Sequence, residues 1–221
     1  MLVYYLTPSQ FAISNIALRR VKIERIADLN DPFELMAIEI FDDRDLELFL
    51  HLKEELNKSK GLLCFSRTWS NPVMWGHYAE RHSGIALGFE GSDEQFEPVI
   101  YAHAPLPVSR ELGTGLPKPT ETEVNKLLRT KFHDWHYENE VRIFVQLDHT
   151  TKEAGLYFYE FDTKLTLREV ILGLKCEIPT EKIRALVNRF EPPVRVVKSS
   201  IAHGTFSVVE NVLASQESNG A

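Results

Sequence analysis

The sequence predicts a single α+β domain with a mixed, mostly antiparallel sheet and about five helices. The chain has 221 residues, of which 43% are hydrophobic and 26% charged, as in ordinary globular proteins with one core. Its opening segments alternate between strand and helix patterns, and its second half contains short strand candidates that follow one another like hairpins. We expect the domain to span residues 1–212, with a flexible polar tail over 213–221.

The N-terminal region reads strand, helix, strand. Residues 2–6 are β-prone, and the next residues, Thr7-Pro8-Ser9-Gln10, have the pattern of a capping box that starts a helix. Residues 21–23 are the next strand candidate. Leu29-Asn30-Asp31-Pro32 then predicts an ordered loop, because Asn and Asp side chains bond their own backbone while proline fixes φ.

The middle of the chain predicts two helices and two buried strands. Residues 45–58 have apolar side chains at helical spacing. Residues 61–66 form an almost wholly apolar strand candidate that ends at Ser66. A helix is expected over 71–82, stopped by glycine, and a strand over 85–89.

The second half predicts a long loop, two helices and further strands. Residues 104–120 are rich in Pro and Gly, which makes regular structure costly, and such a loop can act as a lid over a site. Helical spacing runs from 121 to 135 and gives way to period-two alternation over 141–147. The remaining candidates are strands at 156–161, 170–174, 194–197 and 206–209, and a helix at 180–190.

The net charge, the spacing of the cysteines and the apolar segments disfavour several classes of protein. Lys and Arg number 25 against 32 Asp and Glu, a net charge of −7 that disfavours a nucleic-acid binder. Cys64 and Cys176 have neither metal-knuckle nor disulfide-scaffold spacing. The N-terminus lacks a signal-peptide pattern, and no stretch reaches the roughly 20 apolar residues that span a bilayer. We expect a cytoplasmic protein without a membrane partner, and the sequence does not indicate whether it has a protein partner.

One cluster of unusual residues lies between 74 and 84. On a helix Trp75, Tyr78 and His82 share one face, which could line a pocket for a planar ligand or pack into the core. His77 and His82 lie about 140° apart around a helix, whereas zinc-binding pairs are spaced i, i+4. The sequence therefore predicts no metal site.

A second cluster lies between 133 and 142. If a strand has begun by Glu138, then Glu138, Glu140 and Arg142 point to one face. A bidentate pair between Arg142 and a glutamate would be a structural role. Alternatively, a carboxylate in a pocket walled by Trp135 and Tyr137 would stabilise positive charge or accept a proton.

The common nucleotide and protease motifs are absent. The sequence contains no P-loop, no Rossmann glycine fingerprint, no nucleophile elbow and no zinc-protease helix motif. Cys64 has apolar neighbours, which favour a buried, inert thiol over a nucleophile.

Four sequence boxes together resemble a known bacterial family. In order they are L-N-D-P-F-E at 29–34, C-F-S at 64–66, M-W-G-H-Y-A at 74–79 with His82 and Gly84, and W-H-Y-E-N-E-V-R at 135–142. The chain resembles, over nearly its whole length, the family catalogued as domain of unknown function 2971. The resemblance implies no settled activity, but it does imply that the boxes belong to one domain and converge.

A more distant resemblance is to the ADP-ribosyltransferases. These enzymes combine a polar residue on the first strand, a hydroxyl at a strand end and a late E-x-E glutamate pair. Tyr5 with Thr7, then Ser66, then Glu138-Asn139-Glu140 occur here in that order. The chain departs from the pattern because its first strand has no Arg or His, and Cys-Phe-Ser replaces the usual Ser-Thr-Ser.

This second resemblance implies roles for several residues and NAD as co-substrate. Glu140 would hold the nicotinamide ribose hydroxyl and stabilise an oxocarbenium-like transition state, and Glu138 would orient the acceptor. Trp75 or Tyr78 would stack on the nicotinamide.

Our leading hypothesis is an ADP-ribosyltransferase-like or other nucleotide-handling enzyme. Its expected catalytic residues are Glu140, Glu138, Ser66 and His77. One alternative is a non-catalytic module of a bacterial defence or toxin system that binds a small ligand or a partner. Another is a hydrolase that uses Glu138 and Glu140 as acid and base. The expected ligand-binding residues are Tyr5, Thr7, Asn30, Asp31, Trp75, Tyr78, His82, Trp135 and Arg142.

Overall fold

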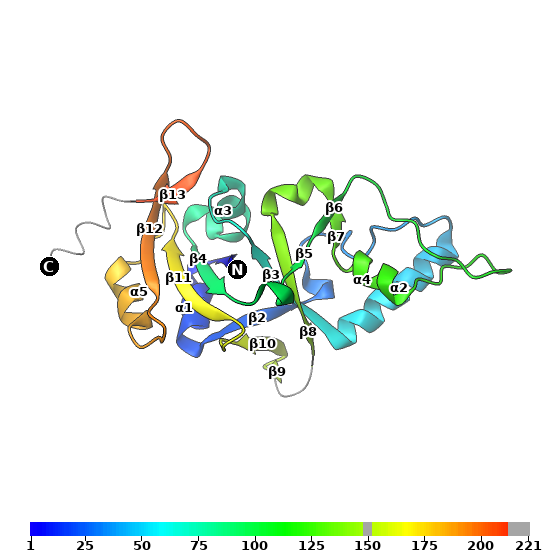
Figure 1. Ribbon diagram of the computed structural model, residues 1–221, viewed down its shortest axis with the longest axis horizontal. Coiled ribbons are helices and arrows are strands. Elements are labelled where there is room, and N and C mark those ends of the chain that lie inside the picture. Colours follow the sequence, from blue (N-terminus) through cyan, green and yellow to red (C-terminus); the bar gives the residue numbers. More distant parts are fainter. Residues whose placement is uncertain (148–151, 212–221) are drawn as a thin grey trace.

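A mixed, mostly antiparallel sheet organises the chain, as Figure 1 shows for the computed structural model. The structure describes residues 1–147 and 152–211, so the predicted tail at 213–221 lies outside the described residues. The predicted α+β class is confirmed. The strands are β1 (Leu2–Thr7), β2 (Arg20–Arg25), β3 (Lys60–Ser66), β4 (Ile85–Glu90), β5 (Glu97–Pro98), β6 (Ile100–Ala102), β7 (Thr130–Phe132), β8 (Glu140–Gln146), β9 (Lys152–Glu153), β10 (Leu156–Glu160), β11 (Thr166–Leu172), β12 (Arg195–Ile201) and β13 (Val208–Glu210).

The main sheet has the order β13-β12-β11-β4-β1-β3-β2-β10-β9, and β8 joins it through β3 and β5. Its neighbours pair antiparallel except β11 and β12, which are parallel. A separate parallel pair forms between β6 and β7. Among the described strands, short connections join only the antiparallel pairs β9–β10 and β12–β13, whereas partners such as β3 and β8 are distant in sequence.

Helices cover the sheet at different places. Ala12, Ile16 and Ile183 bring α1 and α5 into the main hydrophobic cluster, whereas Trp75 brings α3 into a second one. In Figure 1, α2 and α4 lie together at one end of the molecule and α5 lies at the other, beside β12. The helices are α1 (Ser9–Leu18), α2 (Asp43–Ser59), α3 (Pro72–Tyr78), α4 (Glu121–Leu127) and α5 (Thr180–Val187), with short 3₁₀ helices η1 (Ile26–Asp28), η2 (Glu80–His82), η3 (Asp93–Gln95) and η4 (His133–Glu138).

Strand β3 is the branch point of the sheet. One edge pairs with β8 along its whole length, from Lys60 opposite Gln146 to Ser66 opposite Glu140. The other edge is divided: β2 pairs at Gly61 and Leu62, and β1 pairs only at Ser66. Strands β1 and β2 therefore separate beside residues 63–65, and the sheet has an opening in its middle.

Two expectations about the fold are wrong at their C-terminal ends. The helix expected to run to His82 ends at Tyr78, and Glu80, Arg81 and His82 follow with φ of 49°, 54° and 74°. The helical pattern expected to continue to 135 ends at Leu127, because the backbone at 130–132 pairs with β6 and tertiary pairing overrides local periodicity. Thr7 also ends β1 without capping α1, whose N-cap is Pro8.

Two glycines in one sequence box provide a matched stability test. A Cβ at Gly84 would lie 2.4 Å from the carbonyl oxygen of Thr7, whereas a Cβ at Gly76 would meet nothing within 4 Å. Gly84→Ala should lower the free energy of unfolding by about 1–3 kcal/mol through overpacking. Gly76→Ala should leave it unchanged or raise it by about 0.5–1 kcal/mol because alanine favours helix. Urea denaturation measures both, and equal effects of the two substitutions would contradict the close contact at Gly84.

Candidate functional site

A cavity of about 390 Å³ lies where β1 and β2 separate beside β3. Its walls come from these three strands, from the loop that follows η1, and from α3, β7 and the junction of η4 with β8. The volume falls at the lower end of the range of small-ligand sites, which is about 300–1,000 Å³. The second and fourth sequence boxes therefore meet at one place, together with parts of the first and third.

Arg142 is the centre of a buried charge network at one wall of this cavity. Its Nε and Nη2 donate to Glu140 at 2.7 and 3.1 Å, and its Nη1 and Nη2 donate to Glu34 at 3.0 and 2.6 Å. Nη1 also donates to the carbonyl oxygen of Leu128 at 2.9 Å. These bonds use all five N–H donors of the guanidinium. Arg142 therefore has no donor left for a ligand.

Lys131 is the second cation of the network. Its ammonium donates to Glu138 at 2.6 Å and to Glu140 at 3.5 Å, and it lies 3.7 Å from a carboxylate oxygen of Glu34. It also lies 4.6 Å from the ring centroid of Trp135. The carboxylates of Glu138 and Glu140 keep the pKa of Lys131 above its usual value despite burial. The network thus contains three carboxyl groups and two cations.

Glu138 is the carboxyl group of the network that Arg142 does not bind. One of its oxygens binds Lys131, and the other accepts a hydrogen bond from the hydroxyl of Tyr78. Asn30 in turn donates to the Tyr78 hydroxyl at 2.7 Å. A chain of three side chains therefore links the loop after η1 to the carboxyl group through α3.

Glu138 reaches the cavity by a route that differs from the expected one. Strand β8 begins at Glu140, whereas Glu138 ends η4 and Asn139 between them has φ of 46°. Glu140 and Arg142 do share a strand face, but the left-handed residue brings Glu138 to their side. Ser66 fixes this turn, because its hydroxyl donates to the backbone carbonyl of Glu138 at 2.6 Å. Ser66, the strand-end hydroxyl in the resemblance to ADP-ribosyltransferases, therefore has a structural role in this turn.

The two glutamates of the E-x-E pair have opposite pKa shifts. Burial opposes ionisation of Glu140, but Arg142 and then Lys131 outweigh it and lower its pKa to about 2. Burial dominates at Glu138 and raises its pKa, although Lys131 acts in the other direction. Such a divergent pair is typical of sites where one carboxylate stays ionised and the other exchanges a proton.

The structure brings seven of the expected site residues to the cavity. Sequence reasoning had no signal for Lys131, nor for the contact of Glu34 with Arg142, because the partners come from separate segments and meet only in the fold. Cys64 also lines the cavity, and burial raises the pKa of its thiol, as expected for an inert cysteine. The seven expected residues are Tyr5, Asn30, Ser66, Tyr78, Glu138, Glu140 and Arg142.

Trp75, Tyr78 and His82 do not line the cavity together, and Trp75 packs into the core, which is the other role that the sequence left open. Trp75 is fully buried, donates from its indole nitrogen to the carbonyl oxygen of Trp69 and stacks on His82, so neither ring lines the cavity. The turn at 80–82 replaces the last part of the expected helix and moves His82 off the shared face. Only Tyr78 of the three lines the cavity.

Four further expected residues lie away from the cavity walls. His77 and Trp135 belong to a partly exposed ring cluster in which His77 Nδ1 lies 2.9 Å from the hydroxyl of Tyr137. Thr7 is buried at the end of β1, and Asp31 accepts from the backbone nitrogen of Phe33 in a turn. His77 is therefore not among the described residues that line the cavity with Glu140.

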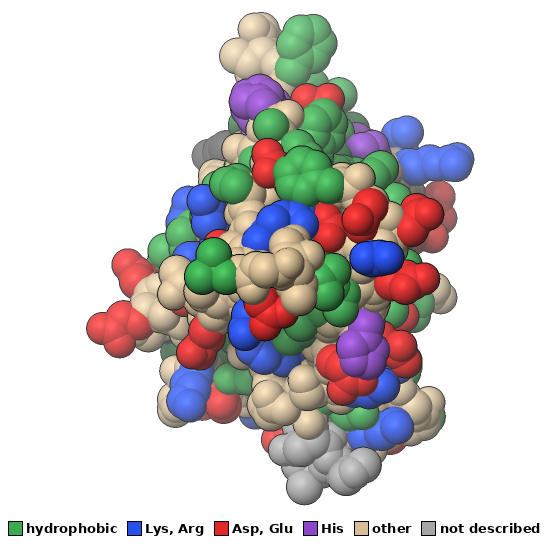
Figure 2. Space-filling model, turned by 90° about the vertical axis from the view of Figure 1, so that its right-hand side faces the viewer, with side chains coloured by type: hydrophobic (Ala, Val, Ile, Leu, Met, Phe, Trp, Pro, Cys, Tyr) green, Lys and Arg blue, Asp and Glu red, His purple; other side chains and the backbone are tan. Residues whose placement is uncertain are grey.

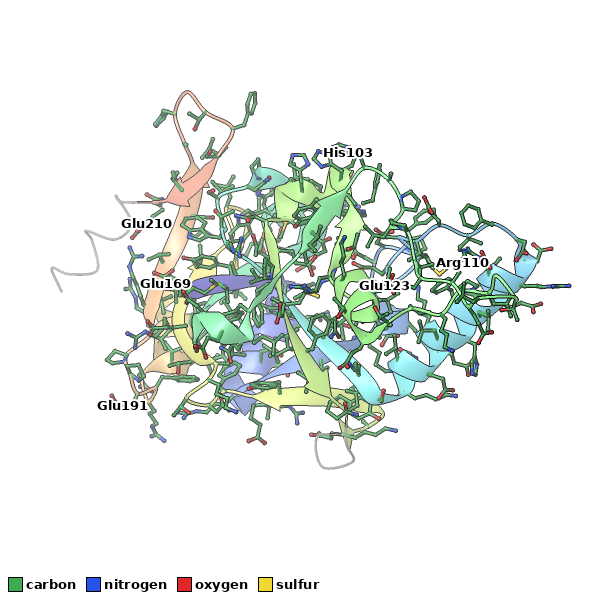
Figure 3. The ribbon with its side chains drawn as sticks, turned by 45° about the vertical axis from the view of Figure 1, so that its right-hand side comes forward. His103, Arg110, Glu123, Glu169, Glu191 and Glu210 are labelled. Carbon is green, nitrogen blue, oxygen red and sulfur yellow. The ribbon has the colours of Figure 1, made fainter. Side chains whose placement is uncertain are left out.

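The Pro- and Gly-rich loop at 104–120 does not cover the cavity. It is irregular, as expected, but none of its residues lines the cavity walls. Arg110 forms an ion pair of 2.6 Å with Asp45 of α2, and Figure 3 shows Arg110 and Glu123 at the α2 end of the molecule. The expected lid is therefore not placed over this site.

Comparison of the chain with protein-family models, with curated proteins and with solved structures finds no match. The two family resemblances accordingly stay predictions. Within residues 1–147 and 152–211, no helix is both long and apolar enough to cross a membrane, and no three His, Cys, Asp or Glu side chains are grouped to hold a metal ion. On the face in Figure 2, basic side chains lie among acidic ones and form no continuous basic surface for nucleic acid.

Removal of Arg142 should be far more damaging than removal of a surface cation. Arg142→Met leaves Glu34 and Glu140 buried without their main partner, and the free energy of unfolding should fall by about 3–5 kcal/mol. Lys58→Met removes an exposed ion pair with Glu55 and should leave stability unchanged within error. Denaturant unfolding of the two variants tests this, and a small loss for Arg142→Met would show that the network does not hold the site together.

The raised pKa of Glu138 predicts a specific pH dependence. A folded-state pKa above the unfolded value means that the proton binds more tightly in the folded protein, so this contribution to stability is lost as pH rises through the folded pKa. Glu138→Gln cannot ionise and should become progressively more stable relative to the wild type as pH rises above 4.5, the ordinary pKa of a glutamate. Urea denaturation of both proteins across this range provides the measurement. A pH-independent difference between them would contradict the shift.

Proposed function

We propose that the protein is a cytoplasmic ADP-ribosyltransferase-like enzyme that breaks the N-glycosidic bond of NAD, releases nicotinamide and transfers the ADP-ribosyl group to an acceptor. The observation that carries this proposal is the register of three strands. Tyr4 of β1 pairs with Ser66 of β3, which pairs with Glu140 of β8. This row contains Ser66 and Glu140, two positions of the distant resemblance, and borders the cavity. The first-strand positions of the resemblance, Tyr5 and Thr7, lie outside the row, although Tyr5 also lines the cavity.

The charge of the site supports chemistry that develops positive charge. In the proposed reaction the bond between nicotinamide and ribose C1′ breaks, and its electron pair leaves with the nicotinamide, which becomes neutral. The ribosyl group carries the positive charge as an oxocarbenium ion. Fixed carboxylates beside the reacting carbon stabilise such a charge without reorganisation, and Glu140, with its pKa near 2, stays ionised.

The geometry favours Glu138 as the carboxyl group that exchanges a proton. The acceptor must lose a proton as its new bond to C1′ forms, and the proposed base is the group with the raised pKa. Tyr78 and Lys131 hold the two oxygens of Glu138 in place. Glu140 is occupied by Arg142 and Lys131, so we assign it electrostatic stabilisation and not contact with the acceptor.

A second candidate is a non-catalytic module that binds a small ligand. It is favoured by the saturation of Arg142, whose five donors all bind protein groups, as in a network that serves only to hold the fold. This candidate predicts that NAD binds without release of nicotinamide. It also predicts that binding survives Glu138→Gln.

Substitution of Glu138 tests the proposal. Glu138→Gln should lower kcat/KM for nicotinamide release from NAD by about 10²–10⁴-fold, the usual contribution of a general base. Glu121→Gln, at an exposed glutamate in the first turn of α4, is the matched control and should retain full activity. Chromatographic detection of nicotinamide provides the measurement. Full activity of Glu138→Gln would overturn the assignment of the base, and absence of release by the wild type would favour the binding module.

A further inference from the structure

The residues that line the cavity have a larger excess of acidic groups than the buried charge network has by itself. The cations are Lys22, Lys131 and Arg142, and the carboxyl groups of Glu24 and Asp28 add to the three of the network. Five carboxyl groups therefore face three cations, an excess of two negative charges when all are ionised. A wall of this charge attracts a cation and repels a diphosphate.

Each cation of the cavity is already paired with a carboxyl group. Arg142 has used its five donors, and Lys131 lies buried among three carboxyl groups. Lys22 forms an ion pair of 2.6 Å with Glu24, and both side chains are partly exposed, at 33% and 26%. A phosphate could thus meet a partly exposed cation of this cavity only at Lys22, where the neighbouring carboxylate of Glu24 repels an anion.

Aromatic rings complete the walls. Tyr4, Tyr5, Tyr78 and Phe65 line the cavity, and the faces of such rings attract organic cations. The cavity volume of about 390 Å³ suits a nucleoside-sized group and leaves little space for a second nucleotide. The charge of the cavity walls, the pairing of the cations and the size of the cavity all favour binding of the nicotinamide riboside end of NAD.

We infer that the cavity recognises the cationic N-ribosyl end of its substrate, a pyridinium nucleoside, and contributes no clamp for the diphosphate. This inference rests on the proposed function, and it names the part of the substrate that is bound. In it, Glu138 provides the carboxylate beside the cationic ring, and the phosphates and adenosine of NAD extend out of the cavity. A phosphate-free pyridinium nucleoside is then a sufficient ligand.

Three ligands separate charge from phosphate. Nicotinamide riboside is cationic and has no phosphate, NAD⁺ is cationic at the same ring and carries the diphosphate, and NADH keeps the diphosphate but has a neutral ring. Isothermal titration of the full chain at low ionic strength should give Kd values for nicotinamide riboside and NAD⁺ within about threefold of each other. NADH should bind at least tenfold more weakly than NAD⁺.

Two variants identify the group responsible. Glu138→Gln should weaken nicotinamide riboside at least tenfold and reduce the preference for NAD⁺ over NADH, whereas Glu121→Gln should change neither. Circular dichroism and denaturant unfolding verify that Glu138→Gln is folded. If NAD⁺ binds more than tenfold tighter than nicotinamide riboside, and Lys22→Gln removes that advantage, the cavity has a phosphate clamp and the inference is overturned.

The outcomes also distinguish this inference from the proposed function. Release of nicotinamide from NAD together with weak or absent binding of nicotinamide riboside overturns the inference and leaves the proposed function standing. Binding of nicotinamide riboside that depends on Glu138, without any cleavage of its glycosidic bond or that of NAD, supports the inference and overturns the proposed function. Equal affinity for NAD⁺ and NADH overturns recognition of charge.

Discussion

The two bidentate contacts of Arg142, one with Glu140 and one with Glu34, are the interaction on which the rest of the site depends. They connect β8 to the loop after η1, and the bond to the Leu128 carbonyl adds the segment after α4. Lys131 then attaches β7 to the same carboxylates. Because β6 and β7 form a separate sheet, these buried charges are a main connection between that sheet and the central strands.

A network of this kind is expensive to bury, and its cost explains its composition. Desolvation disfavours every charge in it, so each carboxylate is tolerated only as far as a cation compensates it. Arg142 binds both Glu34 and Glu140 in bidentate geometry, so these two carboxylates are the best compensated of the three. Burial raises the pKa of Glu138 because Lys131 and the Tyr78 hydroxyl do not outweigh it, whereas Arg142 and Lys131 together lower the pKa of Glu140. The opposite pKa shifts of the E-x-E pair follow from this unequal sharing of the cations.

Local sequence patterns predicted most of the strands and the site residues between 138 and 142. They failed where contacts between distant segments determine the structure. The apolar run at 61–66 and the alternation at 141–147 define the paired strands β3 and β8, and the spacing of Glu140 and Arg142 predicted their contact. The helix expected to 135 was wrong because β6 captures residues 130–132, and that same pairing places Lys131. No periodicity within the chain encodes a contact between Arg142 and Glu34, 108 residues apart.

The opening in the sheet and the charge network depend on each other. Because one edge of β3 is divided between β1 and β2, space remains beside Cys64. The cavity there opens onto groups that would otherwise be enclosed in a core. Glu138 borders this space, and it keeps its position there because Ser66, Lys131 and Tyr78 bind its backbone and side chain. The hydroxyl of Ser66, at the end of β3, therefore holds the turn that carries Glu138. This contact explains why a hydroxyl lies beside the E-x-E pair, and it requires no bond between Ser66 and a substrate.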